Sequence, residues 1–134
     1  MKLILCVSEE MGTMFNNRRQ SRDKVVYKDM TELAGETRLL AGSYSAKLFE
    51  EYPQVVISED YLQEAKDGEY CFYEKGDVTG QKVEQVILYC WNRSYPSDVF
   101  LGDIIDMNQF EKNDEMELKG NSHDKITRQI FERI

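Results

Sequence analysis

The sequence predicts a single α/β domain, residues 1–134, with a mostly parallel, twisted sheet, helices on both faces and an antiparallel C-terminal edge strand. Strand-like and helix-like patterns alternate over about the first 90 residues, which is typical of parallel strands joined by right-handed crossovers. The apolar run at residues 3–7 has the character of a fully buried strand. Residues 125–134 alternate between apolar and other side chains and predict the closing antiparallel strand.

The remaining elements follow from periodicity and turn residues. Val26, Met30 and Leu33 recur at helical spacing, with Ser21 as a candidate N-cap and Gly35 as the stop. Further strands are expected at 38–41, 55–58, 70–73, 83–91 and 99–101, helices at 43–51 and 59–66, a shortened helix at 76–82, and an irregular acidic stretch at 103–120.

Composition narrows the class of protein. The formal net charge is −8 and the pI is near 4.7, so most of the surface would repel a phosphate backbone, which argues against general nucleic-acid binding. No apolar run approaches the roughly 20 residues of a membrane-spanning helix. The sequence therefore predicts a protein without a membrane segment, although a local basic patch could still hold one or two phosphates.

The three cysteines, Cys6, Cys71 and Cys90, all lie in strand-like apolar runs. Their number is odd and no CxxC motif occurs, so we expect reduced core thiols in a cytoplasmic protein. No pair of residues has a recognisable metal-ligand spacing, and no metal is predicted.

The strongest functional signal is a basic cluster in this acidic chain, just before the first helix. A helix N-terminus offers free N–H groups and partial positive charge, so neighbouring arginines would favour phosphate or carboxylate. The alternative is that the arginines pair with surface acids such as Glu9 and Glu10. The candidate anion-binding residues are Asn17, Arg18, Arg19, Ser21 and Arg22.

Several segments, taken in order, resemble dihydrofolate reductase. The similarity is one of pattern, covers nearly the whole chain, and implies that family's fold. The segments are the first strand and its loop with Gly12, residues 38–45 as second strand, glycine and helix, residues 55–58 as third strand, residues 86–89 with 95–100 as a late strand and its follow-on, and residues 121–123 before the closing strand.

The resemblance also implies a site. Asp23, eleven residues after Gly12, corresponds to the family's active-site acid, a carboxylate that holds and polarises a pterin ring. The alternative role for Asp23 is simply to complement the helix dipole. The resemblance implies NADPH as cofactor, and the residues that match the family's cofactor motif are Gly42, Ser43, Tyr44 and Ser45.

The sequence departs from the family at two places. Residues 18–22 are basic where the family has an apolar Pro-Trp-x-Leu-Pro segment, which suits a flat pterin poorly. Glu74 stands where paired glycines let the backbone approach the cofactor pyrophosphate, and it would place negative charge beside phosphate. The first departure argues against a pterin, and the second argues against NADPH in the family's pose.

Three functions remain open. The first is a divergent protein that binds a small anionic or heterocyclic ligand between residues 12–23 and 42–45, with NADPH-dependent reduction and Asp23 as acid. The second is a non-catalytic binding or regulatory module that has lost the cofactor groove. The third is a phosphodiester-directed, RNA-processing protein that uses Arg18, Arg19, Asp23 and His123. Aromatic strands also allow a homodimer.

Overall fold

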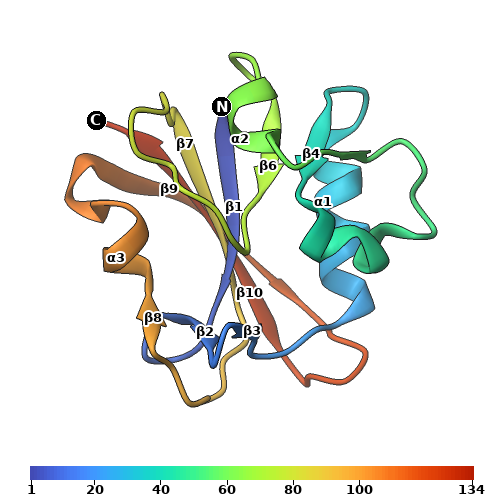
Figure 1. Cartoon of the computed structure of the whole chain (residues 1–134). Coiled ribbons are helices and arrows are strands. Elements are labelled where there is room, and N and C mark those ends of the chain that lie inside the picture. Colours follow the sequence, from blue (N-terminus) through green and yellow to red (C-terminus); the bar gives the residue numbers. More distant parts are fainter.

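The computed structural model describes residues 1–134 and contains a seven-stranded sheet (Figure 1). Five adjacent strands are parallel, β10 is antiparallel to β7, and β9 closes the edge antiparallel to β10. This confirms the predicted mixed sheet with an antiparallel edge. In spatial order the strands are β5 (Val56–Ile57), β4 (Leu39–Ala41), β6 (Tyr70–Phe72), β1 (Lys2–Val7), β7 (Gln85–Cys90), β10 (Ile126–Arg133) and β9 (Phe110–Leu118).

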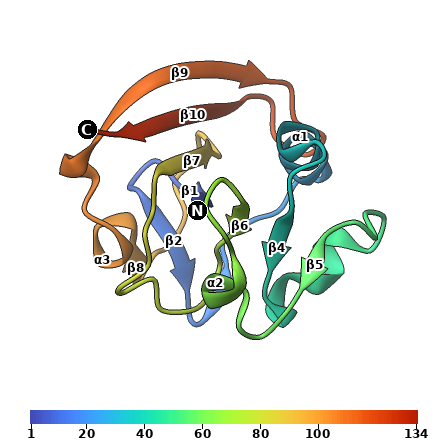
Figure 2. The ribbon, with the colours of Figure 1, turned by 90° about the horizontal axis from the view of Figure 1, so that it is seen from above.

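Helices cover both faces of the sheet, as the sequence predicts (Figure 2). Successive side chains of β1 point to opposite faces, so that Ile4 joins one core and Leu3 and Leu5 join the other. The Ile4 side packs against α1 (Lys24–Ala34) and the 3-10 helix η1 (Ser43–Phe49). The other side packs against α2 (Tyr61–Glu64) and α3 (Leu101–Ile104).

The loop expected after the first strand supplies two of the three strands of a second, smaller sheet. Its order is β3-β2-β8, formed by β2 (Gly12–Phe15), β3 (Arg18–Arg19) and β8 (Val99–Phe100). Asn16 and Asn17 have φ of 50° and 61° and make the two-residue turn between β2 and β3. Asparagine tolerates this left-handed conformation, which suits tight hairpin turns.

The first helix begins differently from the prediction. Its N-cap is Asp23, whose side chain accepts a hydrogen bond from the N–H of Val25, and Ser21 lies two residues outside the cap. Both residue types are good caps, so local pattern alone does not separate them. The predicted stop is confirmed, because Gly35 has φ of 58° and its N–H donates to the carbonyl of Thr31.

Two other expectations were wrong. Residues 103–120 include the end of α3, the short 3-10 helix η2 (Met107–Gln109) and the nine-residue strand β9. Most β9 side chains are exposed, so the strand has no apolar alternation and is held mainly by its ladder with β10. No helix forms at 76–82, where Gly76 and Gly80 have φ of 133° and 80°.

The loops that follow β1, β4, β6 and β7 include most of the residues singled out from the sequence, and His123 lies in the loop between β9 and β10. In parallel sheets, ligands bind at the carboxyl ends of the strands. The three cysteines are free thiols, and Cys71 and Cys90 are buried as expected. None of the helices combines the length and apolar character needed to cross a bilayer.

Candidate functional site

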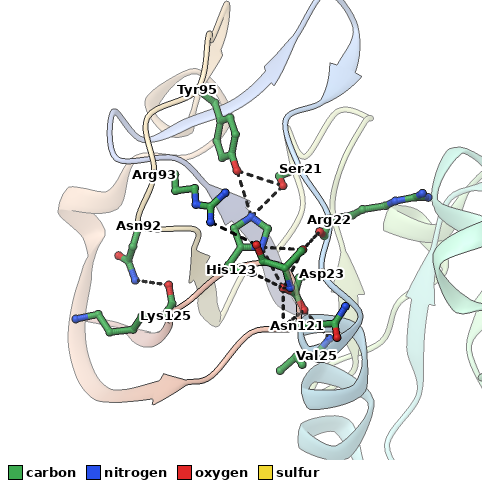
Figure 3. Close-up of polar contacts among 11 residues, drawn as sticks. Ser21, Arg22, Asp23, Val25, Asn92, Arg93, Tyr95, Asn121, His123 and Lys125 are labelled. Carbon is green, nitrogen blue, oxygen red and sulfur yellow. Dashed lines mark hydrogen bonds and ion pairs between the residues drawn. The ribbon is translucent and has the colours of Figure 1, made fainter.

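Asp23 joins the start of α1 to the loop that precedes β10 (Figure 3). Its carboxylate accepts hydrogen bonds from the backbone N–H groups of Asn121, at 3.0 and 2.9 Å, Ser122, at 2.8 Å, and His123, at 3.2 Å. The Ser122 hydroxyl contacts the same carboxylate at 3.3 Å. Asp23 thus holds two segments together that lie about a hundred residues apart in the chain.

The surroundings keep Asp23 ionised. Burial by itself would raise the pKa of this carboxyl, but the hydrogen bonds from Asn121, His123, Val25 and Ser122 outweigh it and hold the pKa well below its usual range. The side chain has no exposed surface. A group with this environment is a fixed negative charge, which orients a partner and does not itself exchange protons near neutral pH.

That partner is His123, whose Nδ1 lies 3.0 Å from Asp23 Oδ2. On the opposite side of the ring, Nε2 lies 3.0 Å from Ser21 Oγ and 3.2 Å from the Tyr95 hydroxyl. The ionised carboxylate favours a proton on Nδ1, which leaves Nε2 as an acceptor. The Tyr95 hydroxyl is also 3.3 Å from Ser21 Oγ. We call Ser21, Asp23, Tyr95 and His123 the His123 cluster.

Packing fixes the orientation of the imidazole. The Trp91 ring stacks on it, with ring centroids 4.7 Å apart and 24° between the planes. Trp91 and His123 are both buried, whereas Ser21 and Tyr95 are partly exposed. The cluster therefore has a buried base and an outer rim made of two hydroxyl groups.

Sequence reasoning named most of these residues but not their association. Ser21 was a candidate anion ligand, Asp23 a candidate acid, and His123 part of the RNA-processing alternative. Trp91 ends the strand predicted at residues 83–91 and is buried, whereas Tyr95, in the segment 95–100 compared with the family, is partly exposed. The signal that brings Ser21 and His123 together is tertiary, because they are 102 positions apart.

The side chains of the basic cluster lie in different surroundings, some paired with other residues and some exposed to solvent. Arg19 is turned inward and makes two hydrogen bonds of 2.8 Å to the Glu74 carboxylate, while its guanidinium lies over the Tyr44 ring at 4.6 Å. Ser45 Oγ donates to the same carboxylate at 2.8 Å. The charge of Arg19 is thus already paired, and β3, η1 and the end of β6 are tied together across the crevice expected between residues 12–23 and 42–45.

The other members of the basic cluster face solvent. Asn17 is an exposed turn residue, and the side chains of Arg18 and Arg22 are exposed. Figure 3 shows Arg22 extending away from His123. Arg18 and Arg22 line different pockets, so the structure does not gather the five residues around one ligand position.

The residues matched to the family's cofactor motif line a groove of about 460 Å³. Gly42, Ser43, Tyr44 and Ser45 form one wall, and the other residues include three carboxylates and one lysine: Glu59, Asp60, Asp77 and Lys75. The Ser43 hydroxyl donates to Glu59. This charge distribution opposes a phosphate-rich ligand.

A second pocket of about 460 Å³ lies beside the β2–β3 hairpin, and we call it the Arg18 pocket. Of the five main pockets, it alone is lined by arginines with no carboxylate. Tyr95 belongs both to its wall and to the His123 cluster. The lining residues are Phe15, Asn16, Arg18, Arg19, Gln20, Tyr95 and Pro96.

No group of three or more histidine, cysteine, aspartate or glutamate side chains converges in a geometry that could hold a metal ion. The polar chemistry at this end of the sheet is carried by hydroxyl, imidazole, carboxylate and guanidinium groups.

The arrangement defines a dihydrofolate-reductase-like α/β fold, and comparison with solved structures shows the same. Dihydrofolate reductase from Enterococcus faecalis, solved in complex with NADP(H) and RAB-propyl, superposes with a TM-score of 0.65 over 98% of this chain and 95% of that one. The two sequences are 13% identical, so the likeness concerns the fold. No family model and no curated protein matches the sequence.

Proposed function

We propose that this protein binds a small ligand with an aromatic or heterocyclic ring and an anionic group in the Arg18 pocket, as a binding module that does not use a nicotinamide cofactor. The observation that carries this is the pocket's composition. In a chain of net charge −8, it combines an exposed arginine with two aromatic side chains and has no lining carboxylate.

The residues of the pocket suit such a ligand. Arg18 has no partner among the protein's ion pairs, so its guanidinium is free to bind a phosphate or carboxylate. Phe15, with 41% of its surface exposed, and Tyr95 offer aromatic faces for a ring. Ligand sites commonly combine apolar walls with a few polar groups that fix orientation.

The Arg19–Glu74 pair argues against a bound nicotinamide cofactor. Glu74 is held by Arg19 and Ser45 at the end of β6, and only 9% of its side chain is exposed. A pyrophosphate placed against this segment would meet a carboxylate and the three acids of the neighbouring groove. Like charges at such short range oppose binding.

The structural likeness to a reductase that binds NADP(H) favours a second candidate, an NADPH-dependent reductase. In that case the groove lined by residues 42–45 would accept the cofactor, and Asp23 would act as the acid. The RNA-processing alternative is weaker, because Arg19, one of its four residues, is already paired with Glu74, and most of the surface of this acidic chain would repel a phosphodiester backbone.

Thermal unfolding in the presence of single ligands tests the proposal. A ligand that binds the native state raises Tm by an amount set by its concentration relative to Kd. We expect phenyl phosphate and benzoate to raise Tm, and NADPH and NADP to leave it unchanged. Arg18→Ala should abolish the shift, whereas Arg22→Ala, an exposed arginine four positions along, should retain it.

Two results would overturn the proposal. One is a Tm shift with phenyl phosphate that survives Arg18→Ala, which would place the ligand elsewhere. The other is a shift with NADPH together with oxidation of NADPH in the presence of dihydrofolate, which would establish the reductase candidate.

A further inference from the structure

We propose that Ser21 is a nucleophile activated by His123 and that the protein hydrolyses esters through a covalent acyl-Ser21 intermediate. The acyl or aryl part of the substrate would occupy the Arg18 pocket, and only this assignment of substrate class rests on the proposed function. The reaction would take place beside the ligand-binding pocket and needs water as its only co-reactant.

The hydrogen-bond geometry carries the proposal. A serine nucleophile needs a base within hydrogen-bond reach and a third group that orients the base. Ser21 Oγ is 3.0 Å from His123 Nε2, and His123 Nδ1 is 3.0 Å from Asp23 Oδ2 (Figure 3). The same order of serine, imidazole and buried carboxylate recurs on unrelated folds, where it is recognised by geometry and not by sequence position.

The surroundings of His123 suit a base. The Asp23 carboxylate is held by backbone N–H groups and stays ionised, so it favours the Nδ1–H form of the ring and stabilises the imidazolium that forms when Nε2 takes a proton. Trp91 stacks on the ring and prevents it from turning. Asp23 is therefore a positioning residue, while Ser21 and His123 are the residues that meet the reacting atoms.

Ser21 does not line the Arg18 pocket itself but adjoins two residues that do, Gln20 and Tyr95. Its side chain is partly exposed, Gln20 precedes it in the wall of the pocket, and the Tyr95 hydroxyl lies 3.3 Å from its oxygen. A ring held between Phe15 and Tyr95, with its anionic group on Arg18, would present an ester bond near Ser21. The Tyr95 hydroxyl would donate a hydrogen bond to the developing oxyanion.

The reaction proceeds in two balanced steps. Ser21 Oγ attacks the carbonyl carbon while its proton passes to His123 Nε2. The bond from that carbon to the leaving alkoxide then breaks, and His123 returns the proton to the alkoxide as an alcohol. Water next attacks the acyl-serine and gives its proton to Nε2, and collapse of this intermediate releases the carboxylic acid and reforms the Ser21 hydroxyl.

An uncharged alkyl fluorophosphonate tests whether Ser21 is a nucleophile, because its reaction does not depend on anion binding in the Arg18 pocket. Ser21 Oγ would bond to phosphorus with loss of fluoride, and the adduct is read as a mass increase on the intact native protein and located by peptide mapping. We expect one adduct, on Ser21. It should be absent in Ser21→Ala, unchanged in Ser94→Ala, an exposed serine next to Tyr95, and formed at least about 100-fold more slowly in His123→Gln.

The outcomes separate the two proposals. No adduct on Ser21, or an adduct that forms as fast in His123→Gln as in the wild type, would overturn the nucleophile and leave ligand binding in the Arg18 pocket intact. If His123→Gln does not fold, Tyr95→Phe replaces it as the second variant. Retained p-nitrophenyl acetate turnover in a folded Ser21→Ala protein would equally refute a Ser21 reaction. An adduct without any phenyl phosphate binding would instead refute the pocket assignment alone.

Discussion

At the scale of single residues, Asp23 shows how one carboxylate can serve several structural purposes. It caps α1 and satisfies three consecutive backbone N–H groups of the loop before β10. Gly120 lies next to this contact, and a side chain there would overlap the His123 carbonyl and approach Asp23. The tight approach of the loop to α1 therefore depends on both residues.

Replacing Asp23 with alanine should lower the free energy of unfolding by about 2–4 kcal/mol. The loss combines an N-cap, worth about 1 kcal/mol, with buried donors that would lose their partner. Urea unfolding measures this value. Asp124→Ala is the matched control, because Asp124 is an exposed aspartate one position from His123, and it should change stability by less than about 0.5 kcal/mol. Equal losses in the two variants would contradict the structural role of Asp23.

At the scale of elements, the Arg19–Glu74 pair ties the β2–β3 hairpin to the central sheet and to η1. The backbone N–H of Arg19 also donates to the Tyr44 hydroxyl at 3.0 Å. The Nζ of Lys75 lies 3.8 Å from the centre of the same tyrosine ring. These contacts cross the crevice where the sequence predicted a ligand. Their effect is to hold the hairpin in place beside the Arg18 pocket.

A double-mutant cycle on this pair should show strong coupling. Glu74→Ala leaves the Arg19 guanidinium, with 24% of its side chain exposed, without its partner. The loss of unfolding free energy caused by Glu74→Ala should therefore be larger in the wild type than in the Arg19→Met variant. We expect a coupling energy of about 1–3 kcal/mol from urea unfolding. The exposed Lys28–Glu32 pair is the control, with coupling below about 0.5 kcal/mol. Coupling as weak as the control would mean that the pair does not secure the hairpin.

At the scale of the whole molecule, an acidic protein keeps its fold by pairing selected carboxylates. Glu69 receives hydrogen bonds of 2.7 and 2.8 Å from Arg38, and this contact lowers the pKa of Glu69 to about 2. The pKa of Asp23 is also lowered, through its hydrogen bonds to the loop before β10. In both cases the folded state favours the ionised form of the carboxyl group.

Stability should therefore fall in acid. A carboxyl group whose pKa is lower in the folded state contributes stability above its unfolded pKa and loses it as the pH falls toward the folded value. For Glu69 this window runs from about pH 4.5 to about pH 2. Urea midpoints measured across this range should decline, and Glu69→Gln should make the decline shallower. A midpoint that stays constant down to pH 2 would contradict the prediction.

Much of the fold could be predicted because its signals are local. Apolar runs mark β1 and β7, Gly35 marks the end of α1, and the alternation of strands with helices indicates parallel pairing. β9 escaped prediction because most of its side chains face solvent, so its pairing with β10 leaves no apolar pattern in the sequence. The β2–β3 hairpin escaped because its strands are very short.

For the candidate site, too, some features follow from local sequence signals and others only from the tertiary structure. The sequence by itself determined the α/β class, whereas a site at the loops around residues 12–23 and 42–45 stays a prediction. Only the tertiary structure decided that Arg19 is paired with Glu74, that Arg18 and Arg22 face different pockets, and that Ser21, Asp23 and His123 form one hydrogen-bonded series. The physical reason is that periodicity and capping act within a few residues, whereas these contacts join segments 55 to 102 positions apart.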